Sequence, residues 1–183
     1  MHAMTIAQLL NLIVATEGAY TDHPSDLGGP TIWGITERVA RACGYTKPMH
    51  VMSREEAKEI YLKEYIQKPG FDKIFELSPE IGGEVIDTGV NMGVPISAMF
   101  FQRILNAMNQ RQKHYPDVVI DGDCGPRTIT AFKAYLAKRG KDGVLVMLSA
   151  LNSLQGERYI DISEKREQNE DFTFGWFLNR VQI

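Results

Sequence analysis

The chain has 183 residues, of which 44% are hydrophobic and 23% charged, and its formal net charge is −3. This is the composition of a globular protein, with one compact domain or two small lobes on a shared core, and it excludes a disordered chain. The acidic balance argues against broad electrostatic binding to nucleic acid or to an anionic membrane. No apolar run approaches the ~18 residues that a transmembrane helix needs, so stable membrane insertion is not expected.

An amphipathic helix is predicted at the start of the chain, capped by Thr5 and running to about residue 17. Its apolar stripe follows helical spacing and ends in a carboxylate: Ile6, Leu10, Ile13 and Glu17. A carboxylate on such a face, at the negative end of the helix dipole, has its charged form disfavoured. Since a carboxylic acid held protonated near neutral pH can donate a proton, Glu17 is a candidate general acid.

Residues 20–35 predict a loop with a small hairpin around residues 31–35. This loop contains the following polar and aromatic side chains: Asp22, His23, Asp26, Thr31 and Trp33. Spacing alone leaves simpler interpretations open, because a lone glutamate at a helix end is usually a solvated charge and an Asp-Leu-Gly-Gly run is usually a turn. His23 is interpreted as a solvated loop residue rather than as a base.

The rest of the chain predicts a mainly α fold of seven to eight helices. Thr36 is a candidate N-cap, Ser53 and Glu56 have the spacing of a capping box, and Pro126 suits the first position of a helix. Helices are expected at about residues 37–43, 54–67, 80–92 and 95–108, from residue 126, and at 141–166 and 170–181. Trp176 is interpreted as an anchor that packs the last helix onto the body.

A polar stretch, Asn109–Asp117, is the best candidate for a boundary between two lobes, residues 4–108 and 109–183. A glycine-rich turn, Asp121–Thr128, follows it and feeds a helix. Its Asp-Gly-Asp run lacks the spacing and the closing glutamate of an EF-hand, so calcium is not expected there. The histidines are scattered along the chain and the two cysteines lack metal-type spacing, so neither a metal nor another cofactor is expected.

Three ordered blocks within residues 17–36 resemble the phage and prophage muramidases of glycoside hydrolase family 108. The blocks are Glu17-Gly18-Ala19-Tyr20, then Asp26-Leu27-Gly28-Gly29-Pro30-Thr31, then Gly34-Ile35-Thr36. Ala19 departs from the family, which usually has a second glycine there. The resemblance extends to Asp87, Asn91 and the glycine that follows, and to the closing Gly175–Arg180 segment. Residues 121–128 are similar to the turn of the peptidoglycan-binding modules that accompany this family.

The resemblance implies a lysozyme-like helical fold and cleavage of the β-1,4 bond between N-acetylmuramic acid and N-acetylglucosamine in peptidoglycan. It makes Glu17 the general acid. For the second catalytic role, Asp26 is preferred and Asp22 is the runner-up, with Thr31 bonding a water or the carboxylate. Tyr20 and Trp33 are expected to stack on sugar rings. Asn91 could hold an acetamido group, although a buried structural role for Asp87 and Asn91 is the favoured interpretation.

The expected partners follow from the same resemblance. They are peptidoglycan glycan strands and, for release, a holin-type protein, as for a phage or prophage endolysin. The N-terminal sequence lacks the basic start of a signal peptide, so synthesis in the cytoplasm and action in the cell wall after release are expected. The alternative is a non-catalytic wall-binding or secretion-activating accessory protein that keeps the lysozyme-like shape.

Overall fold

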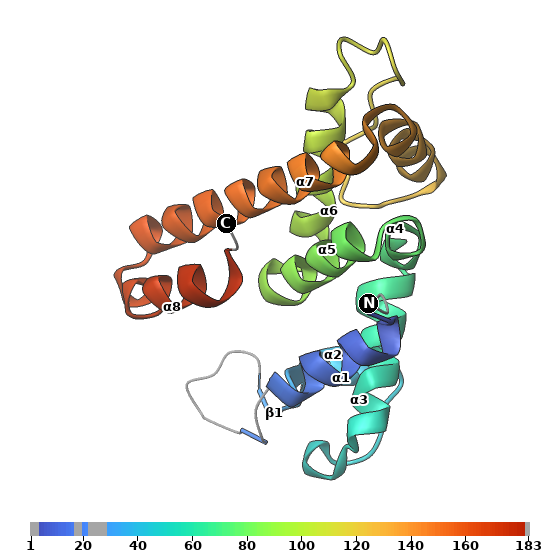
Figure 1. Cartoon of the computed structure of the whole chain (residues 1–183). Coiled ribbons are helices and arrows are strands. Elements are labelled where there is room, and N and C mark those ends of the chain that lie inside the picture. Colours follow the sequence, from blue (N-terminus) through green and yellow to red (C-terminus); the bar gives the residue numbers. More distant parts are fainter. Residues whose placement is uncertain (1–3, 17–19, 22–28, 182–183) are drawn as a thin grey trace. The chain divides into compact units, whose positions relative to one another are not determined.

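The structure is a computed structural model that describes residues 4–16, 20–21 and 29–181. It divides into two compact units, Met1–Asp72 and Lys73–Ile183, called here the first and the second unit. The described residues form eight α-helices, short 3-10 and π segments and one two-stranded sheet (Figure 1). The prediction of a mainly α fold with a small hairpin is therefore confirmed.

The first helix, α1 (Ile6–Thr16), begins as its sequence predicts. The Thr5 hydroxyl oxygen accepts a hydrogen bond from Gln8 N at 3.2 Å, and Gln8 Oε1 accepts one from Thr5 N at 2.8 Å. This reciprocal pair satisfies two amide groups that would otherwise lack partners at the start of a helix. The buried side chains of the helix lie on one face, at helical spacing: Leu9, Leu10, Ile13 and Val14. Leu10 and Ile13 belong to the predicted stripe.

A tight hairpin and a short helix follow in the first unit. Strands β1 (Thr31–Ile32) and β2 (Ile35–Thr36) pair antiparallel. Helix α2 (Glu37–Ala42) is capped by the Thr36 hydroxyl, which accepts from Val39 N, and a 3-10 turn (Met49–Val51) leads to the next helix. The prediction of Thr36 as an N-cap is correct.

The second half of the predicted helix 54–67 has a different geometry from the first. Helix α3 (Arg54–Ile60) starts with the predicted capping box of Ser53 and Glu56. The chain then continues as a π-helix (Tyr61–Gln67) and ends before Pro69, which has no amide hydrogen to continue the ladder.

Four helices follow α4 (Phe71–Leu77), which contains the boundary between the units and was not predicted. Helix α5 (Pro79–Met92) is capped by Ser78, and α6 (Val94–Met108) buries Phe100, Phe101, Ile104 and Leu105. Helix α7 (Pro126–Lys165) joins two predicted helices, with a kink at Gly140, where φ is 56°. A 3-10 turn (Glu167–Asn169) precedes α8 (Glu170–Arg180).

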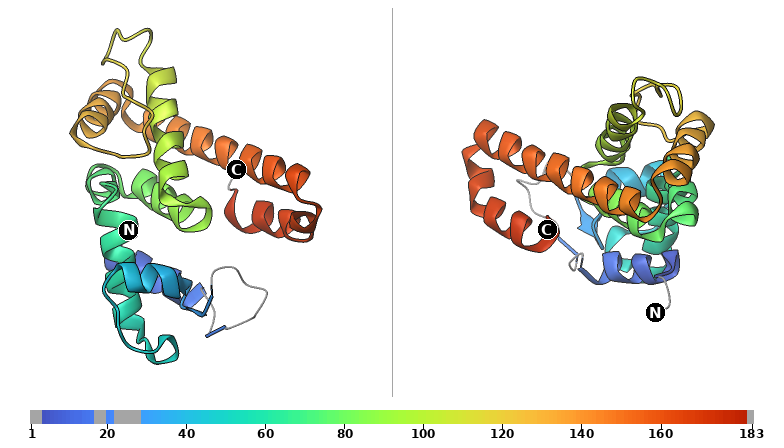
Figure 2. Two further views of the ribbon diagram at one scale, coloured as in Figure 1. Left: turned by 180° about the vertical axis from the view of Figure 1, so that it is seen from behind. Right: turned by 45° about the horizontal axis from the view of Figure 1, so that its top comes forward.

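The last helix folds back along the second half of α7 (Figure 2). The ring of Trp176 stacks on the ring of Tyr159 with 5.0 Å between centroids, and Phe177 contacts the same tyrosine at 6.1 Å. Asn169 Nδ2 donates to Ile162 O at 2.8 Å and fixes the turn between the helices. Trp176 is therefore the packing anchor that the sequence predicts.

Among the described residues, no helix combines the length and the apolar character needed to span a membrane. The predicted lobe boundary at residues 108–109 falls inside the second unit, in the segment that joins α6 to α7. The division into lobes 4–108 and 109–183 remains a prediction about domains.

Candidate active site

The hairpin holds Thr31 and Trp33 at fixed places in the first unit. Ile32 pairs with Ile35, so Trp33 and Gly34 form a two-residue turn. Both have positive φ angles, 53° and 74°, as a type I′ turn requires. Thr31 also exchanges two backbone hydrogen bonds of 2.8 Å with Thr21, so the bridge ties the hairpin to the residues before it.

Trp33 adopts a backbone conformation that is strained for a bulky residue, and the surrounding contacts hold it there. Its indole Nε1 donates to Met52 O at 2.9 Å, and its carbonyl oxygen accepts from the Tyr61 hydroxyl at 3.1 Å. The Arg54 guanidinium lies over the indole ring, 4.9 Å from its centroid. The side chain is thus rigidly positioned, and one ring face is already covered by Arg54.

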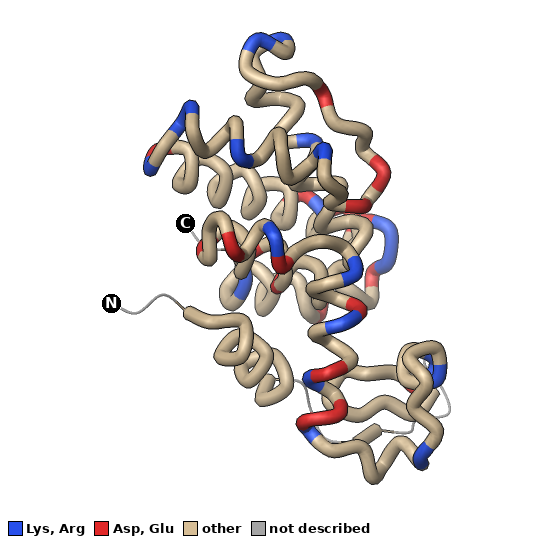
Figure 3. The backbone as a smooth tube through the Cα atoms, turned by 90° about the vertical axis from the view of Figure 1, so that its right-hand side faces the viewer, with Lys and Arg blue, Asp and Glu red and all other residues tan. Residues whose placement is uncertain are grey.

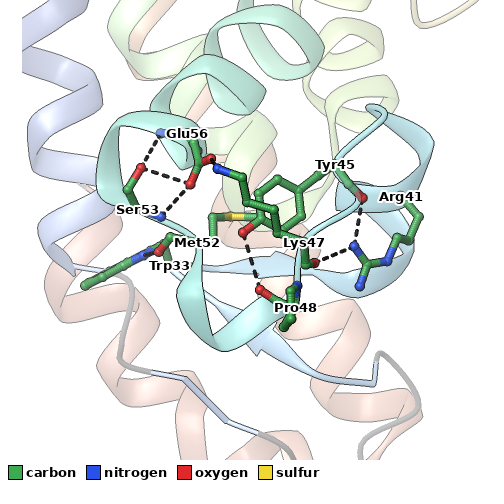
Figure 4. Close-up of polar contacts among 8 residues, drawn as sticks. All are labelled: Trp33, Arg41, Tyr45, Lys47, Pro48, Met52, Ser53 and Glu56. Carbon is green, nitrogen blue, oxygen red and sulfur yellow. Dashed lines mark hydrogen bonds and ion pairs between the residues drawn. The ribbon is translucent and has the colours of Figure 1, made fainter.

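The chain before and after Met52, whose carbonyl oxygen accepts the hydrogen bond from Trp33, is itself held by polar contacts (Figure 4). Arg41 donates to the carbonyl oxygens of Tyr45 and Lys47, both at 2.7 Å, and Lys47 forms an ion pair with Glu56 at 2.7 Å. The hydrogen bonds from Lys47 and then from Ser53 lower the pKa of Glu56 to about 2. Glu56 is therefore ionised near neutral pH, and it is not a candidate for a general acid.

The two predicted catalytic carboxylates, Glu17 and Asp26, lie outside the described residues, as do Asp22 and His23. Thr31, the third predicted catalytic residue, is among the residues that the structure describes. It is half-buried, and its hydroxyl donates to Gly29 O at 3.1 Å. The roles assigned to all three remain predictions.

Tyr20 and Asn91, the other predicted substrate contacts, are both exposed. The Tyr20 ring meets the His50 ring edge-on, with 6.1 Å between centroids. Asn91 lies near the end of α5 and donates through Nδ2 to the carbonyl oxygen of Asp87 at 3.0 Å and to its carboxylate at 3.3 Å. That carboxylate also binds Arg180 of α8, at 3.0 and 3.2 Å. The structural role of Asp87 is apparent, but the prediction that the pair is buried is wrong.

A polar cluster between α5 and α7, consisting of Glu84, Thr88, Gln155 and Tyr159, was not predicted. Gln155 and Tyr159 are 0% and 3% exposed, and Gln155 Nε2 donates to the Thr88 hydroxyl at 3.3 Å. Three buried oxygens have no hydrogen-bond partner among the described residues: Glu84 Oε1, Gln155 Oε1 and the Tyr159 hydroxyl. In the sequence, the one signal was a glutamate set between apolar residues of a helix.

Burial raises the pKa of Glu84 and shields one of its carboxylate oxygens. Desolvation, and then the charge of Asp87, raises the pKa of Glu84 to about 7, against a weaker opposing hydrogen bond with Thr88. One carboxylate oxygen, Oε1, is shielded from solvent, and the residue is half-buried beside α7. We therefore interpret Glu84 as a structural acid of the second unit.

Stability of the second unit should fall as the pH rises from 5 to 8. Below pH 4.5 Glu84 is neutral whether folded or unfolded. Above that value the unfolded chain releases the proton first, and ionisation inside the fold costs on the order of 3 kcal/mol by pH 8. Glu84→Gln should flatten the dependence of Tm on pH. The exposed Glu157→Gln on α7 is the control, and equal slopes in the two variants would contradict the assignment.

Comparison with known proteins identifies two family segments in the chain. Residues 10–93 match the family described as Glycosyl hydrolase 108, and residues 96–181 match a Predicted Peptidoglycan domain. The chain therefore combines a glycosyl hydrolase 108 segment with a peptidoglycan domain. A search of curated proteins found no match. The solved structure of Brucella abortus SagA is similar in fold, with a TM-score of 0.59 and 21% sequence identity over 92% of this chain and 95% of that one.

The two family segments divide the described site residues between them. Thr31, Trp33 and Asn91 lie in the hydrolase segment, which also covers Glu17 and Asp26 in the sequence. The glycine-rich turn at 121–128 and all of α7 and α8 lie in the peptidoglycan segment. At the level of the family, hydrolysis or binding of peptidoglycan is the function.

Proposed function

We propose that the protein is an N-acetylmuramidase that cleaves the β-1,4 bond between N-acetylmuramic acid and N-acetylglucosamine, with Glu17 as general acid. The observation that carries the proposal is the match of residues 10–93 to the hydrolase family, because that segment contains every predicted catalytic residue. The strained hairpin supports it, since backbone strain held by surrounding contacts is common at functional sites.

In the proposed reaction, Glu17 protonates the glycosidic oxygen as the bond to the sugar breaks. Asp26 stabilises the positive charge that develops on the sugar ring, or activates the water that attacks it. The proton of the Thr31 hydroxyl is engaged with Gly29 O, so its oxygen is free to accept a hydrogen bond from that water. This acceptor would turn a lone pair of the water toward the sugar.

The remaining contacts would position the glycan. Trp33, fixed by Met52 and Arg54, offers a rigid aromatic edge, and Tyr20 offers an exposed ring. Asn91 donates through its nitrogen, and its carbonyl oxygen has no partner among the described residues. That oxygen is suited to accept from the N–H of an acetamido group. We further propose an endolysin role in the cell wall, with release through a holin-type partner.

The proposal is tested by the chemistry of the chain ends released from purified peptidoglycan. A muramidase leaves N-acetylmuramic acid at the new reducing end, which borohydride reduction followed by mass spectrometry identifies. New N-acetylglucosamine ends would point to a different bond. Sedimentation of the protein with the wall, without any new reducing ends, would favour the non-catalytic accessory function instead.

A further inference from the structure

A groove of about 600 Å³ lies in the second unit, between the first turns of α7 and the segment 114–118. On α7 it is lined by residues that share one helix face: Pro126, Arg127, Thr130, Ala131 and Ala134. The small side chains of Ala131 and Ala134 leave the space open, and Pro116 and Val118 form the opposite wall. Its volume is that of a small-ligand site, and its surface is mostly apolar.

The wall of the groove is held in place by α6. The Asn106 side chain forms two hydrogen bonds with the backbone of Val118. Its Oδ1 accepts from Val118 N and its Nδ2 donates to Val118 O, each at 2.8 Å. The Tyr115 hydroxyl donates to Leu105 O at 2.9 Å. Because these bonds hold the wall against α6, the space in front of α7 stays open without a ligand, and the groove is pre-formed.

The base of α7 is fixed by a second set of contacts around the buried side chain of Gln102. Its Oε1 accepts from Asp121 N at 3.1 Å and from Gly122 N at 3.0 Å, and its Nε2 donates to Asp123 O at 2.9 Å. These bonds fold the glycine-rich turn that the sequence singled out and deliver Pro126 to the start of α7. The turn thus builds one end of the groove.

The segment that forms the groove is opposite in net charge to the whole chain. Residues 109–139 contain six Lys and Arg against three Asp, a net charge of +3, whereas the complete chain carries −3. Figure 3 shows Lys and Arg at the tip of the loop that joins α6 to α7. Burial, followed by the charges of Lys138, Arg139 and Lys113, lowers the pKa of His114, as expected in a positive field. An anionic occupant is favoured.

One cation of the groove is available to bind such an occupant. Arg127 is exposed and has no ion pair or hydrogen bond among the described residues. Asp117, the acidic residue of the lining, already accepts a hydrogen bond from Asn109. A guanidinium at the edge of an apolar floor suits a ligand that combines a carboxylate with small apolar groups.

We propose that this groove binds the stem peptide of peptidoglycan, with a peptide carboxylate on Arg127 and alanine methyl groups on Ala131 and Ala134. The proposal rests on peptidoglycan being the ligand of the chain, and it assigns peptide recognition to residues other than the predicted glycan contacts. Stem peptides are short, rich in alanine and anionic, which matches the small apolar floor and the positive field.

The test is titration of the full-length chain with stem tetrapeptides that are acetylated at the N-terminus, as the acylated wall peptide is, and that carry lysine or diaminopimelate at the third position. Calorimetry gives the Kd, and amide chemical shifts locate the contact. Arg127→Ala should weaken binding roughly tenfold, as the loss of a charge-assisted hydrogen bond implies. Ala134→Phe should fill the groove and abolish binding. Arg103→Ala removes an equal charge from an exposed position of α6 that does not line the groove, and it should leave the Kd unchanged.

Several results would overturn the proposal. These are absence of tetrapeptide binding, a Kd unchanged by both groove variants, shifts of the groove amides by peptide-free glycan alone, or a dimer that Ala134→Phe dissociates. Hydrolysis of peptide-free glycan strands separates this proposal from the proposed function. Hydrolysis without tetrapeptide binding would refute only the groove assignment. Tetrapeptide binding without hydrolysis would refute only the muramidase.

Discussion

Glu17→Gln should reduce the release of reducing ends from peptidoglycan by about a hundredfold to ten-thousandfold, the usual contribution of a general acid. Glutamine has nearly the same shape as the protonated acid but cannot transfer a proton to the leaving oxygen. The helix before it should be unaffected, because α1 is held by the Thr5 and Gln8 caps and by four buried side chains: Leu9, Leu10, Ile13 and Val14. The measurement is the initial rate on purified peptidoglycan.

A matched control separates loss of the acid from a general effect of removing a carboxylate. Glu55 on α3 has a side chain that is 78% exposed, and Glu55→Gln should hydrolyse peptidoglycan at the wild-type rate. Thermal unfolding of both variants should agree with the wild type. The basic limb of the pH–rate profile should disappear with Glu17. A fully active Glu17→Gln variant would refute its role and leave the acid to be found elsewhere.

The sequence was most informative where a structure depends on neighbouring residues. The capping box of Ser53 and Glu56, the N-cap at Thr36 and the proline start of α7 are set by residues at most three positions apart. The hairpin is local too, because Trp33 and Gly34 alone form its turn. These features could be predicted, and with them the mainly α fold.

The missed features depend on partners that are distant in the sequence. Gln155 meets Thr88 across 67 positions, and Arg180 meets Asp87 across 93. No periodicity of one helix reveals such a pairing, so the raised pKa of Glu84 and the half-buried Asp87–Arg180 ion pair could not be predicted. At Gly140 the sequence predicted the end of one helix and the start of another for a different reason. Its positive φ allows a kink within α7, so no loop separates the two predicted helices.

For the same reason, the sequence predicted the identity of some site residues but not their contacts or exposure. Trp33 was identified as an aromatic side chain of the loop between two family blocks, yet the contacts that fix it come from Met52, Arg54 and Tyr61, on later elements. Asn91 was placed on the correct helix, but its exposure depends on how α5 packs in the second unit. A motif therefore indicates which residues are special, while the fold decides what each one can touch.

Two adjacent glycines of α5 should respond in opposite ways to the same substitution. A Cβ on Gly82 would lie 2.3 Å from the Cα of Phe75 and 2.6 Å from its nitrogen, which is backbone that cannot swing away. A Cβ on Gly83 would meet nothing within 4 Å. Since α4 crosses α5 at Gly82, Gly82→Ala would have to push the two helices apart, and overpacking of this kind should destabilise the second unit by about 3 kcal/mol.

Gly83→Ala is the matched control, and it should stabilise the fold by up to about 1 kcal/mol, because alanine has the higher helix propensity and the site has room. Urea unfolding of the full-length chain, followed by far-UV circular dichroism, gives both changes in the free energy of unfolding. Their difference isolates the contact with Phe75, since the gain in helix propensity is common to both variants. Equal stability of the two variants would show that α4 does not approach α5 as closely as the structure has it.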